Sequence, residues 1–273
     1  MLHRKLLNTL ILAALAVPGI AMAADAAPAV TANVGFTTDY IFRGIAQTSH
    51  NPAVQGGIDY AHTSGFYAGM WGSNVSWIAD SQAISVVGGV QQGSTTMELD
   101  TYLGFRNTFA EDFGYDVGFI RYNYLGSYTP AANALIPGTN LAKADTDEIY
   151  GAISYKWISA KYSYALGNFL TVPGAKGTNY IELNASYPIG DSGFTVAAHA
   201  GKQTYKGITA DLAAAAGNTP TYTDYKLGVT KDLGGYVVGL AYTSTNASPF
   251  YTWPAAGGKW GKGTTALSLT HAF

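Results

Sequence analysis

The chain contains no cysteine and few charged residues. Of its 273 residues none is Cys, and only 12% are Asp, Glu, Lys or Arg. The absence of cysteine excludes disulfides and cysteine-ligated metal sites. The 17 acidic residues slightly outnumber the 15 basic ones, and the basic residues are not clustered along any segment. A nucleic-acid partner is therefore not expected.

Long apolar runs are also missing after the first residues. No later run reaches the roughly 18 residues that a membrane-spanning helix needs. At the amino end, His3-Arg4-Lys5 precedes an apolar run from Leu6 to Val17, and Ala21-Met22-Ala23 has the small-x-small pattern of a cleavage site. We expect a signal peptide over residues 1–23 and one domain over residues 24–273.

The chain is rich in glycine and tyrosine and shows period-two alternation along most of its length. It has 33 Gly and 20 Tyr. The first segment, from Val30 to Tyr40, places Val30, Ala32, Val34 and Phe36 on one face and polar residues or Gly35 on the other, which indicates a half-apolar strand. Similar segments follow near 53–61, 66–75, 96–106, 114–124, 146–155, 159–167, 178–187, 194–201, 222–230, 236–245 and 264–273. The pattern predicts about twelve antiparallel strands.

Short and long connections alternate between these segments. Most of the short ones carry the Gly, Pro, Asp or Ser that tight turns require. They fall at 62–65, 107–113, 156–158, 188–193 and 231–235. The long ones fall at 45–52, 76–95, 125–145, 168–177, 202–221 and 246–263. Because strand direction alternates, all turns lie at one end and all loops at the other. The sequence predicts an all-β, up-and-down antiparallel barrel.

Three observations place the apolar face of this barrel in lipid. Charged residues occur on the polar strand face, and charged groups that line the inside of a barrel need water. A barrel of about twelve strands is wide enough for water, because side chains do not readily fill it. Aromatic residues recur where the apolar face meets the turns, as in an interfacial girdle: Tyr60, Phe66, Phe105, Tyr115, Tyr155, Tyr187, Phe194, Tyr236 and Phe273. A closed barrel also satisfies every backbone group within the bilayer. We therefore expect a transmembrane barrel with periplasmic turns and extracellular loops.

Two features of this register need explanation. Tyr40, Phe42 and Tyr242 suggest a second aromatic ring at the loop end. Arg121 falls on the lipid face, where a mid-membrane arginine costs about 2 to 4 kcal/mol. Either a bulge near Ile120 exchanges the two faces, or Arg121 lies high enough to reach the headgroups.

The charged residues of the polar face are candidates for lining a pore. The set is Asp39, Arg43, Asp59, Glu98, Asp100, Arg106, Asp116, Glu148, Lys161, Glu182, His199, Asp224 and Lys226. Acidic groups outnumber basic ones, which predicts a mild cation preference. Asp39 and Arg43 are four residues apart on one expected strand face, so they form either an ion pair that braces the pore mouth or a selectivity element.

Signals of catalysis or cofactor binding are weak. If Tyr187 pairs with Phe194, Glu182 stands opposite His199, as a general-base pair or as a structural one. The sequence has no Gly-x-Ser-x-Gly segment that would supply a nucleophilic serine to this pair. Glu98 and Asp100, two residues apart on one strand face, are more simply charges on the barrel wall than a pair of catalytic carboxylates. The histidine spacing predicts no metal site, and no cofactor is expected. The stretch from Asp211 to Gly217 could cap and form a short helix in a long loop.

One block of sequence resembles a known family. The residues Phe36-Thr37-Thr38-Asp39-Tyr40-Ile41-Phe42-Arg43-Gly44-Ile45 and Pro52-Ala53-Val54-Gln55-Gly56-Gly57 resemble the opening signature of the TorF porin family, a proteobacterial family formerly catalogued as Gcw_chp. The likeness continues through 65–69, 71–75, 148–150 and 154–164. The resemblance implies an outer-membrane barrel with a channel role, and it supplies neither a substrate nor catalytic residues.

These observations lead to one expected function and two alternatives. We expect a porin-like channel of the bacterial outer membrane for passive diffusion of small polar solutes or ions, and not an enzyme. A plugged structural or adhesive barrel is the first alternative, and a lipid-modifying barrel enzyme is the second. The expected partners are the outer-membrane bilayer, small solutes and the barrel insertion machinery, which would recognise the terminal Phe273. The oligomeric state is left open.

Overall fold

The computed structural model describes residues 29–81, 92–110, 112–130, 132–133, 135–253 and 258–273. The expected signal peptide and its cleavage site therefore lie outside the described residues and stay a prediction. Part of the 76–95 connection lies outside them as well.

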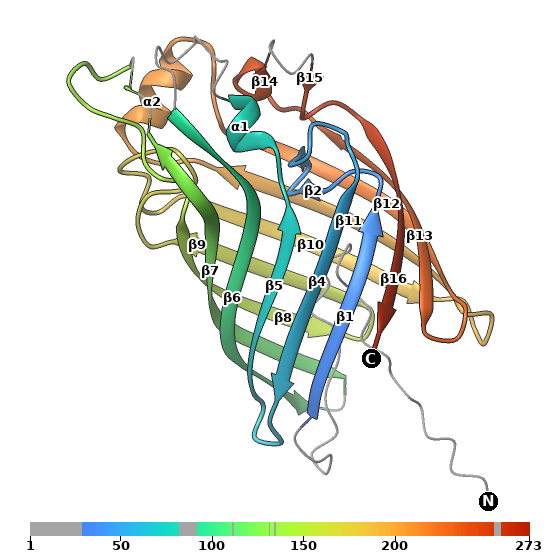
Figure 1. The fold of residues 1–273 in the computed structure, drawn as a ribbon. Coiled ribbons are helices and arrows are strands. Elements are labelled where there is room, and N and C mark those ends of the chain that lie inside the picture. The colour runs from blue at the N-terminus through green and yellow to red at the C-terminus, as the bar shows by residue number, and fades with distance from the viewer. Residues whose placement is uncertain (1–28, 82–91, 111, 131, 134, 254–257) are drawn as a thin grey trace, which may run out of the picture.

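Twelve strands form a closed antiparallel barrel (Figure 1). Each strand pairs with its neighbour along the chain, and the last strand returns to pair with the first, for example through Val34 and His271. The strands are β1 (Ala29–Thr37), β4 (Ala53–Ala61), β5 (Phe66–Asn74), β6 (Gln92–Ala110), β7 (Phe113–Thr129), β8 (Thr146–Tyr155), β9 (Ile158–Ala165), β10 (Asn179–Pro188), β11 (Phe194–Thr204), β12 (Tyr222–Asp232), β13 (Tyr236–Thr245) and β16 (Thr264–Ala272). The predicted fold class is confirmed.

The smaller elements all belong to the long connections. They are β2 (Ile41–Phe42), β3 (Ile45–Ala46), α1 (Trp77–Ser81), α2 (Ile208–Ala215), the 3-10 turn η1 (Pro249–Tyr251), β14 (Thr252–Trp253) and β15 (Gly258–Lys259). The helix expected after Asp211 exists but starts earlier, with Gly207 at its N-cap and Asp211 in its first turn. No helix among the described residues is long and apolar enough to cross a bilayer.

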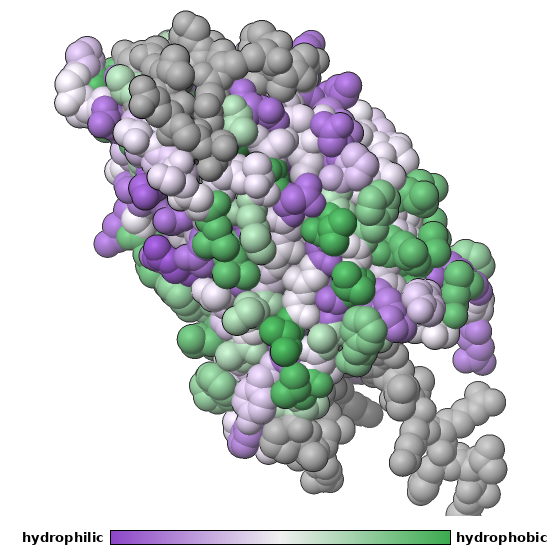
Figure 2. All heavy atoms as spheres, in the orientation of Figure 1, coloured by the Kyte–Doolittle hydropathy of each residue, from purple (hydrophilic) through white to green (hydrophobic). Residues whose placement is uncertain are grey.

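The outer face of the barrel is apolar. Side chains such as Val54 and Leu227 point outward with 62% and 66% of their surface exposed. Figure 2 shows hydrophobic side chains over the middle and lower part of the visible wall, with hydrophilic ones gathered toward the loop end and the rims. Of the girdle residues, Phe66 is half-buried and the others are exposed. A belt of this kind is what a transmembrane barrel presents to lipid.

Arg121 lies on this outer face without a bulge beside it. The β6–β7 ladder is irregular only between Thr95 and Met97 and between Thr108 and Ala110, so the first of the two alternatives, a bulge near Ile120, is wrong. The Arg121 guanidinium donates to the Asp147 carboxylate at 2.9 and 3.0 Å. It sits one residue before Tyr122, whose pairing with Thr146 ends the β7–β8 ladder at the loop end. Its charge is thus paired with that of Asp147 close to the loop end of the ladder.

The second aromatic ring is not formed as expected. Tyr242 is exposed on the outer face, but Tyr40 is buried and Phe42 packs edge-on against Tyr122, with 5.5 Å between ring centroids. Both residues lie inside the barrel because β1 ends at Thr37 and the chain then turns inward.

Candidate functional site: a hairpin across the lumen

The segment between β1 and β4 folds into the loop end of the barrel as a small hairpin, β2–β3. Its two strands pair through Ile41–Ala46 and Phe42–Ile45. The turn consists of Arg43 and Gly44, whose φ angles are +45° and +82°. Two positive φ angles in a two-residue turn match the twist of the paired strands. We call residues 41–46 the lumen hairpin.

The tip of the lumen hairpin touches the inner wall at β12 and β13. A Cβ atom on Gly44 would stand 2.5 Å from Asp224 Cβ on β12 and 2.6 Å from Thr245 Cγ2 on β13. Only glycine fits there, because the position combines a left-handed φ with wall atoms closer than side chains tolerate. The hairpin therefore extends inside the barrel from β1 and β4 to β12 and β13, past the intervening strand β16.

Arg43 fastens the tip to the wall. Its guanidinium donates to both oxygens of Glu148 on β8, at 3.0 and 2.7 Å, and to Gln203 Oε1 on β11 at 3.0 Å. The side chains of Arg43 and Glu148 are 8% and 0% exposed. The Tyr222 hydroxyl donates to the Arg43 carbonyl oxygen at 2.8 Å. A buried bidentate pair with added hydrogen bonds is the arrangement that offsets the cost of removing charges from water.

Aromatic rings complete the surroundings of this guanidinium. Its Cζ atom lies 4.9 Å from the Phe42 centroid, 5.9 Å from that of Phe169 and 4.5 Å from that of Tyr180. Such cation–π contacts gain strength away from water. The residue that fixes the hairpin is thus held by side chains of four barrel strands, β8, β10, β11 and β12.

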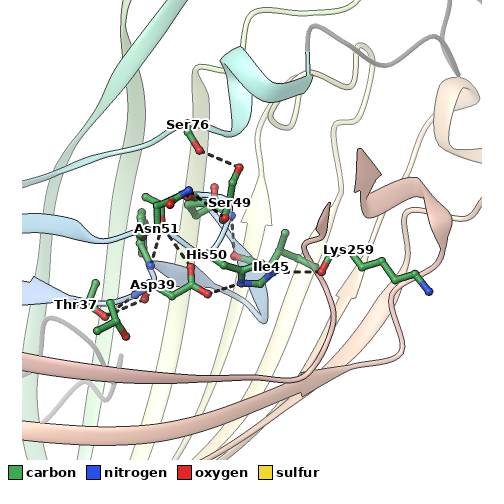
Figure 3. Close-up of polar contacts among 12 residues, drawn as sticks. Thr37, Asp39, Ile45, Ser49, His50, Asn51, Ser76 and Lys259 are labelled. Atoms are coloured by element: carbon green, nitrogen blue, oxygen red, sulfur yellow. Dashed lines mark hydrogen bonds and ion pairs between the residues drawn. The ribbon is translucent and has the colours of Figure 1, made fainter. Parts of the chain in front are cut away.

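The base of the lumen hairpin is held by a second polar group (Figure 3). His50 Nδ1 lies 2.6 Å from Asp39 Oδ2, and His50 Nε2 lies 3.4 Å from the Lys259 carbonyl oxygen. Burial raises the pKa of the Asp39 carboxyl, while the contact with His50 acts in the opposite direction. The Ser49 hydroxyl contacts the Asp80 carboxylate of α1. The expected Asp39–Arg43 pair is therefore wrong, because the first residue pairs with His50 and the second with Glu148.

Apolar packing closes the space around the hairpin. Ala46, Ile78 and Trp260 are fully buried, and the Ala46 amide donates to the Trp260 carbonyl at 3.0 Å. The buried cluster around them is made of Tyr40, Ile45, Ala46, Ala53, Val75, Trp77, Ile78, Tyr122, Tyr124, Tyr128, Ala144, Tyr222, Tyr251 and Trp260. Within the part of the chain that the structure describes, this cluster packs the lumen hairpin against the surrounding wall and loops.

Tyrosines on the inner wall bind the carboxylates that surround the lumen. The Tyr40 hydroxyl donates to Glu98 at 2.7 Å, and the Tyr102 hydroxyl donates to Asp59 at 2.6 Å. The Tyr67 hydroxyl donates to Asp116 at 2.6 Å, and the Tyr180 hydroxyl donates to Asp224 at 2.8 Å. Glycines on neighbouring strands make room for these rings. A Cβ on Gly201 would stand 1.9 Å from the Tyr180 hydroxyl oxygen. The sequence signal for this network is a tyrosine and a glycine at inward positions on adjacent strands. Our sequence analysis did not use this signal.

The candidate pore residues fall into two groups. Asp39 and Arg43 belong to the inward-folded segment. The others point to the inner face of the barrel: Asp59, Glu98, Asp100, Arg106, Asp116, Glu148, Lys161, Glu182, His199, Asp224 and Lys226. The cationic groups of Arg106 and Lys161 lie over the rings of Tyr67 and Tyr150. Their role in lining a pore stays a prediction.

His199 sits in a polar network that differs from the expected pair. The register places Asn184, not Glu182, opposite His199. His199 Nδ1 lies 2.7 Å from Asn184 Oδ1 and Nε2 lies 2.9 Å from Asp224 Oδ2, whereas Glu182 Oε2 is 3.6 Å from Nδ1. Among the described residues no serine hydrogen-bonds this histidine, and none of the described ranges holds three or more His, Asp or Glu placed to bind a metal ion.

Several solved porins share the barrel form at very low sequence identity. The KdgM porin in complex with disordered oligogalacturonate aligns with a TM-score of 0.49 at 7% identity, covering 90% of this chain and 99% of that one. The NanC porin aligns at 0.47 and 10% identity, again over 90% and 99%. The anion-selective porin of Comamonas acidovorans aligns at 0.38 and 12% identity, with the same coverage. No curated protein matches the chain in sequence.

A family model covers almost all of the chain. It is described as "Bacterial protein of unknown function (Gcw_chp)" and matches residues 21–273, which include every barrel strand and the lumen hairpin. The resemblance seen in the opening motif is confirmed at the level of this family, and the name TorF stays an expectation. The chain belongs to the bacterial Gcw_chp family.

Proposed function

We propose that this protein is a porin-like channel of the bacterial outer membrane for small polar solutes or ions. One observation carries the proposal: a closed barrel with an apolar exterior encloses a wall of charged and hydroxyl-bearing side chains. A barrel of this width needs water inside it if its inner face is polar. Passage would be passive, without a cofactor or a chemical step.

The lumen hairpin sets the conductance of this channel. With the hairpin in place, the packed cluster around Trp260 would narrow the loop end of the lumen; its members are buried against one another. Removal of one partner from a buried ion pair leaves the other charge uncompensated, at a cost of about 3 to 5 kcal/mol. Loss of the Arg43 guanidinium would leave Glu148 in that state, so the closed arrangement would be weakened and the hairpin released.

Swelling of liposomes that contain the mature protein tests this proposal. We expect slow entry of small polar solutes such as arabinose with the native protein, and clearly faster entry with Arg43→Ala. The matched control is Arg106→Ala, which removes an inward arginine that lies over the Tyr67 ring on the barrel wall. Equal permeation by Arg43→Ala, Arg106→Ala and native protein would contradict the role of the hairpin.

A plugged structural barrel is the second candidate, and the buried hairpin is the observation that favours it. The two candidates differ in what happens when the hairpin is released. If correctly inserted Arg43→Ala protein admits no solute of any size, the barrel is structural and the channel proposal is wrong.

The terminal Phe273 is proposed to guide insertion of the barrel. Its side chain is 73% exposed, while its backbone amide donates to the Ala32 carbonyl at 2.8 Å. The ring is thus largely exposed for recognition, although it packs edge-on against the His271 ring and the strand end is paired. Deletion of Phe273 should reduce the amount of heat-modifiable barrel in outer membranes, and unchanged amounts would remove the proposal.

A further inference from the structure

Four polar side chains form a patch on the outer face of the barrel. Thr101 on β6, Arg121 on β7 and Asp147 on β8 lie side by side in the strand register. Asn123, the next outward residue of β7, accepts from Arg121 Nε at 2.9 Å through its Oδ1 atom. The side chains of Arg121 and Asp147 are 43% and 35% exposed, so the ion pair reaches the surface. We call these four residues the outer patch.

Apolar side chains border the outer patch along the strands. On the turn side, Leu103 on β6 and Ile149 on β8 are exposed. The paired strands β6 and β7 continue past the patch toward the loops, where Met97 and Leu125 are exposed as well. On these strands the patch therefore interrupts an apolar surface that resumes beyond it.

Strand geometry places this interruption inside the bilayer. Arg121 follows the girdle residue Tyr115 by six positions on β7. At about 3.3 Å per residue and a tilt of about 40°, six residues rise about 15 Å along the membrane normal. The apolar band of such barrels is about 25 Å tall. Arg121 and Asp147 thus lie at a depth where acyl chains surround the barrel.

The contacts within the patch leave one hydrogen-bonding group unused. Arg121 donates through Nη1 to Asp147 and through Nε to Asn123, and its Nη2 group makes no hydrogen bond with any described residue. Acyl chains offer no acceptor, and a polar group exposed to hydrocarbon is costly. A lipid phosphate would accept from Nη2, but it would also meet the Asp147 carboxylate, which already neutralises the arginine. The patch therefore suits a partner that carries both charges itself.

A second copy of this chain is such a partner. In a membrane the two-fold axis of a dimer runs along the membrane normal, so each residue meets partner residues at its own depth. If the axis passes between β7 and β8, Arg121 faces the partner's Asp147, and Asp147 faces the partner's Arg121. The patch is self-complementary in this way because its cation and its anion are register partners on adjacent strands.

We propose that the outer wall at β7 and β8, centred on Arg121 and Asp147, is the contact between two copies of this protein in the outer membrane. Polar side chains hold membrane-embedded segments together because the alternative is exposure to hydrocarbon. The exposed apolar side chains beside the patch, such as Ile149, would pack across the same contact. The inference does not depend on the proposed channel, since the contact lies on the lipid-facing side of the wall.

Oxidative cross-linking in outer membranes tests the contact. The chain has no cysteine, so an introduced thiol is the only one it carries. Ile149, the next outward residue after Asp147 on β8, lies close to the expected axis and is 47% exposed. The matched control is Leu240 on β13, which is 49% exposed on the other side of the barrel. We expect Ile149→Cys to give at least several-fold more disulfide-linked dimer than Leu240→Cys. Equal cross-linking of the two heat-modifiable variants, or none from Ile149→Cys, would overturn the proposal.

Variants of the charge pair show whether it holds the contact together. In the Ile149→Cys background, Arg121→Gln with Asp147→Asn keeps the patch polar and neutral but removes the ionic attraction, so cross-linking should fall several-fold. Exchange of the two charges, Arg121→Asp with Asp147→Arg, keeps the pair within each copy and between copies, so cross-linking should return. Unchanged cross-linking in the neutral variant would contradict the role of the pair. If neither charge variant folds, the comparison of Ile149→Cys with Leu240→Cys decides alone.

Native mass spectrometry of the mature protein in mild detergent separates the dimer from the other possible occupant. We expect a dimer, and a monomer in Arg121→Gln with Asp147→Asn. A native monomer that carries an anionic lipid, lost in Arg121→Gln, would place a headgroup phosphate at the outer patch and overturn the proposal.

Discussion

At the scale of single residues, the conformation of the lumen hairpin depends on the backbone geometry and the contacts of Arg43 at its turn. Arg43 adopts a left-handed φ of +45°, which is uncommon for a residue with a long side chain. Strain of this kind persists when surrounding contacts determine the conformation. Here the contacts are the bonds to Glu148, Gln203 and Tyr222. The sequence could not predict this geometry, because Glu148 and Gln203 lie 105 and 160 residues away along the chain.

Gly44→Ala tests the fit of the tip. Its φ of +82° disfavours any side chain, and the added Cβ would meet Asp224 and Thr245. We expect the hairpin to be destabilised by about 1 to 3 kcal/mol, with more frequent channel openings. Gly138→Ala is the control, since Gly138 has the same φ of +82° but no atom within 4 Å of the added Cβ. Equal opening rates in the two variants would show that wall contact at the tip is unimportant.

At the scale of elements, alternation predicted the strands and missed the hairpin. The strands are readable because one face meets lipid and the other does not, so the period-two signal is strong. Beyond Thr37 the alternation continues through Asp39 and Arg43, and this suggested a longer first strand. The competing signal was the Arg43-Gly44 pair between Ile41-Phe42 and Ile45-Ala46, a short hairpin pattern. The tyrosine–glycine contacts of the wall were missed because they depend on register between strands.

A disulfide at the base of the hairpin should lock it. The Ser49 and Ser76 hydroxyl oxygens are 3.1 Å apart, and the chain has no other cysteine to compete. We expect Ser49→Cys/Ser76→Cys to form an intramolecular bond on oxidation and to suppress channel openings, which a reductant should restore. The single variants serve as controls. Openings that persist in fully oxidised protein would mean that the base of the hairpin need not move.

At the scale of the whole molecule, the charges on the inner wall lead to a prediction about ion preference. Carboxylates there outnumber basic groups, and many accept hydrogen bonds from tyrosines that carry no charge of their own. We propose a mild cation preference, measured as the reversal potential across planar bilayers in a salt gradient. Asp59→Asn should reduce the preference and Lys161→Gln should increase it. An anion-directed reversal potential in the native protein would contradict this reading of the charges.

The most direct test of the central claim is the single-channel conductance of two forms of the mature protein. One form is native, and in the other a Gly-Ser linker replaces residues 41–46. A polar lumen closed by the hairpin predicts small or rare openings in the native form and a stable conductance at least several-fold larger in the linker form. Equal conductance in the two forms, or none in a correctly inserted linker form, would contradict it.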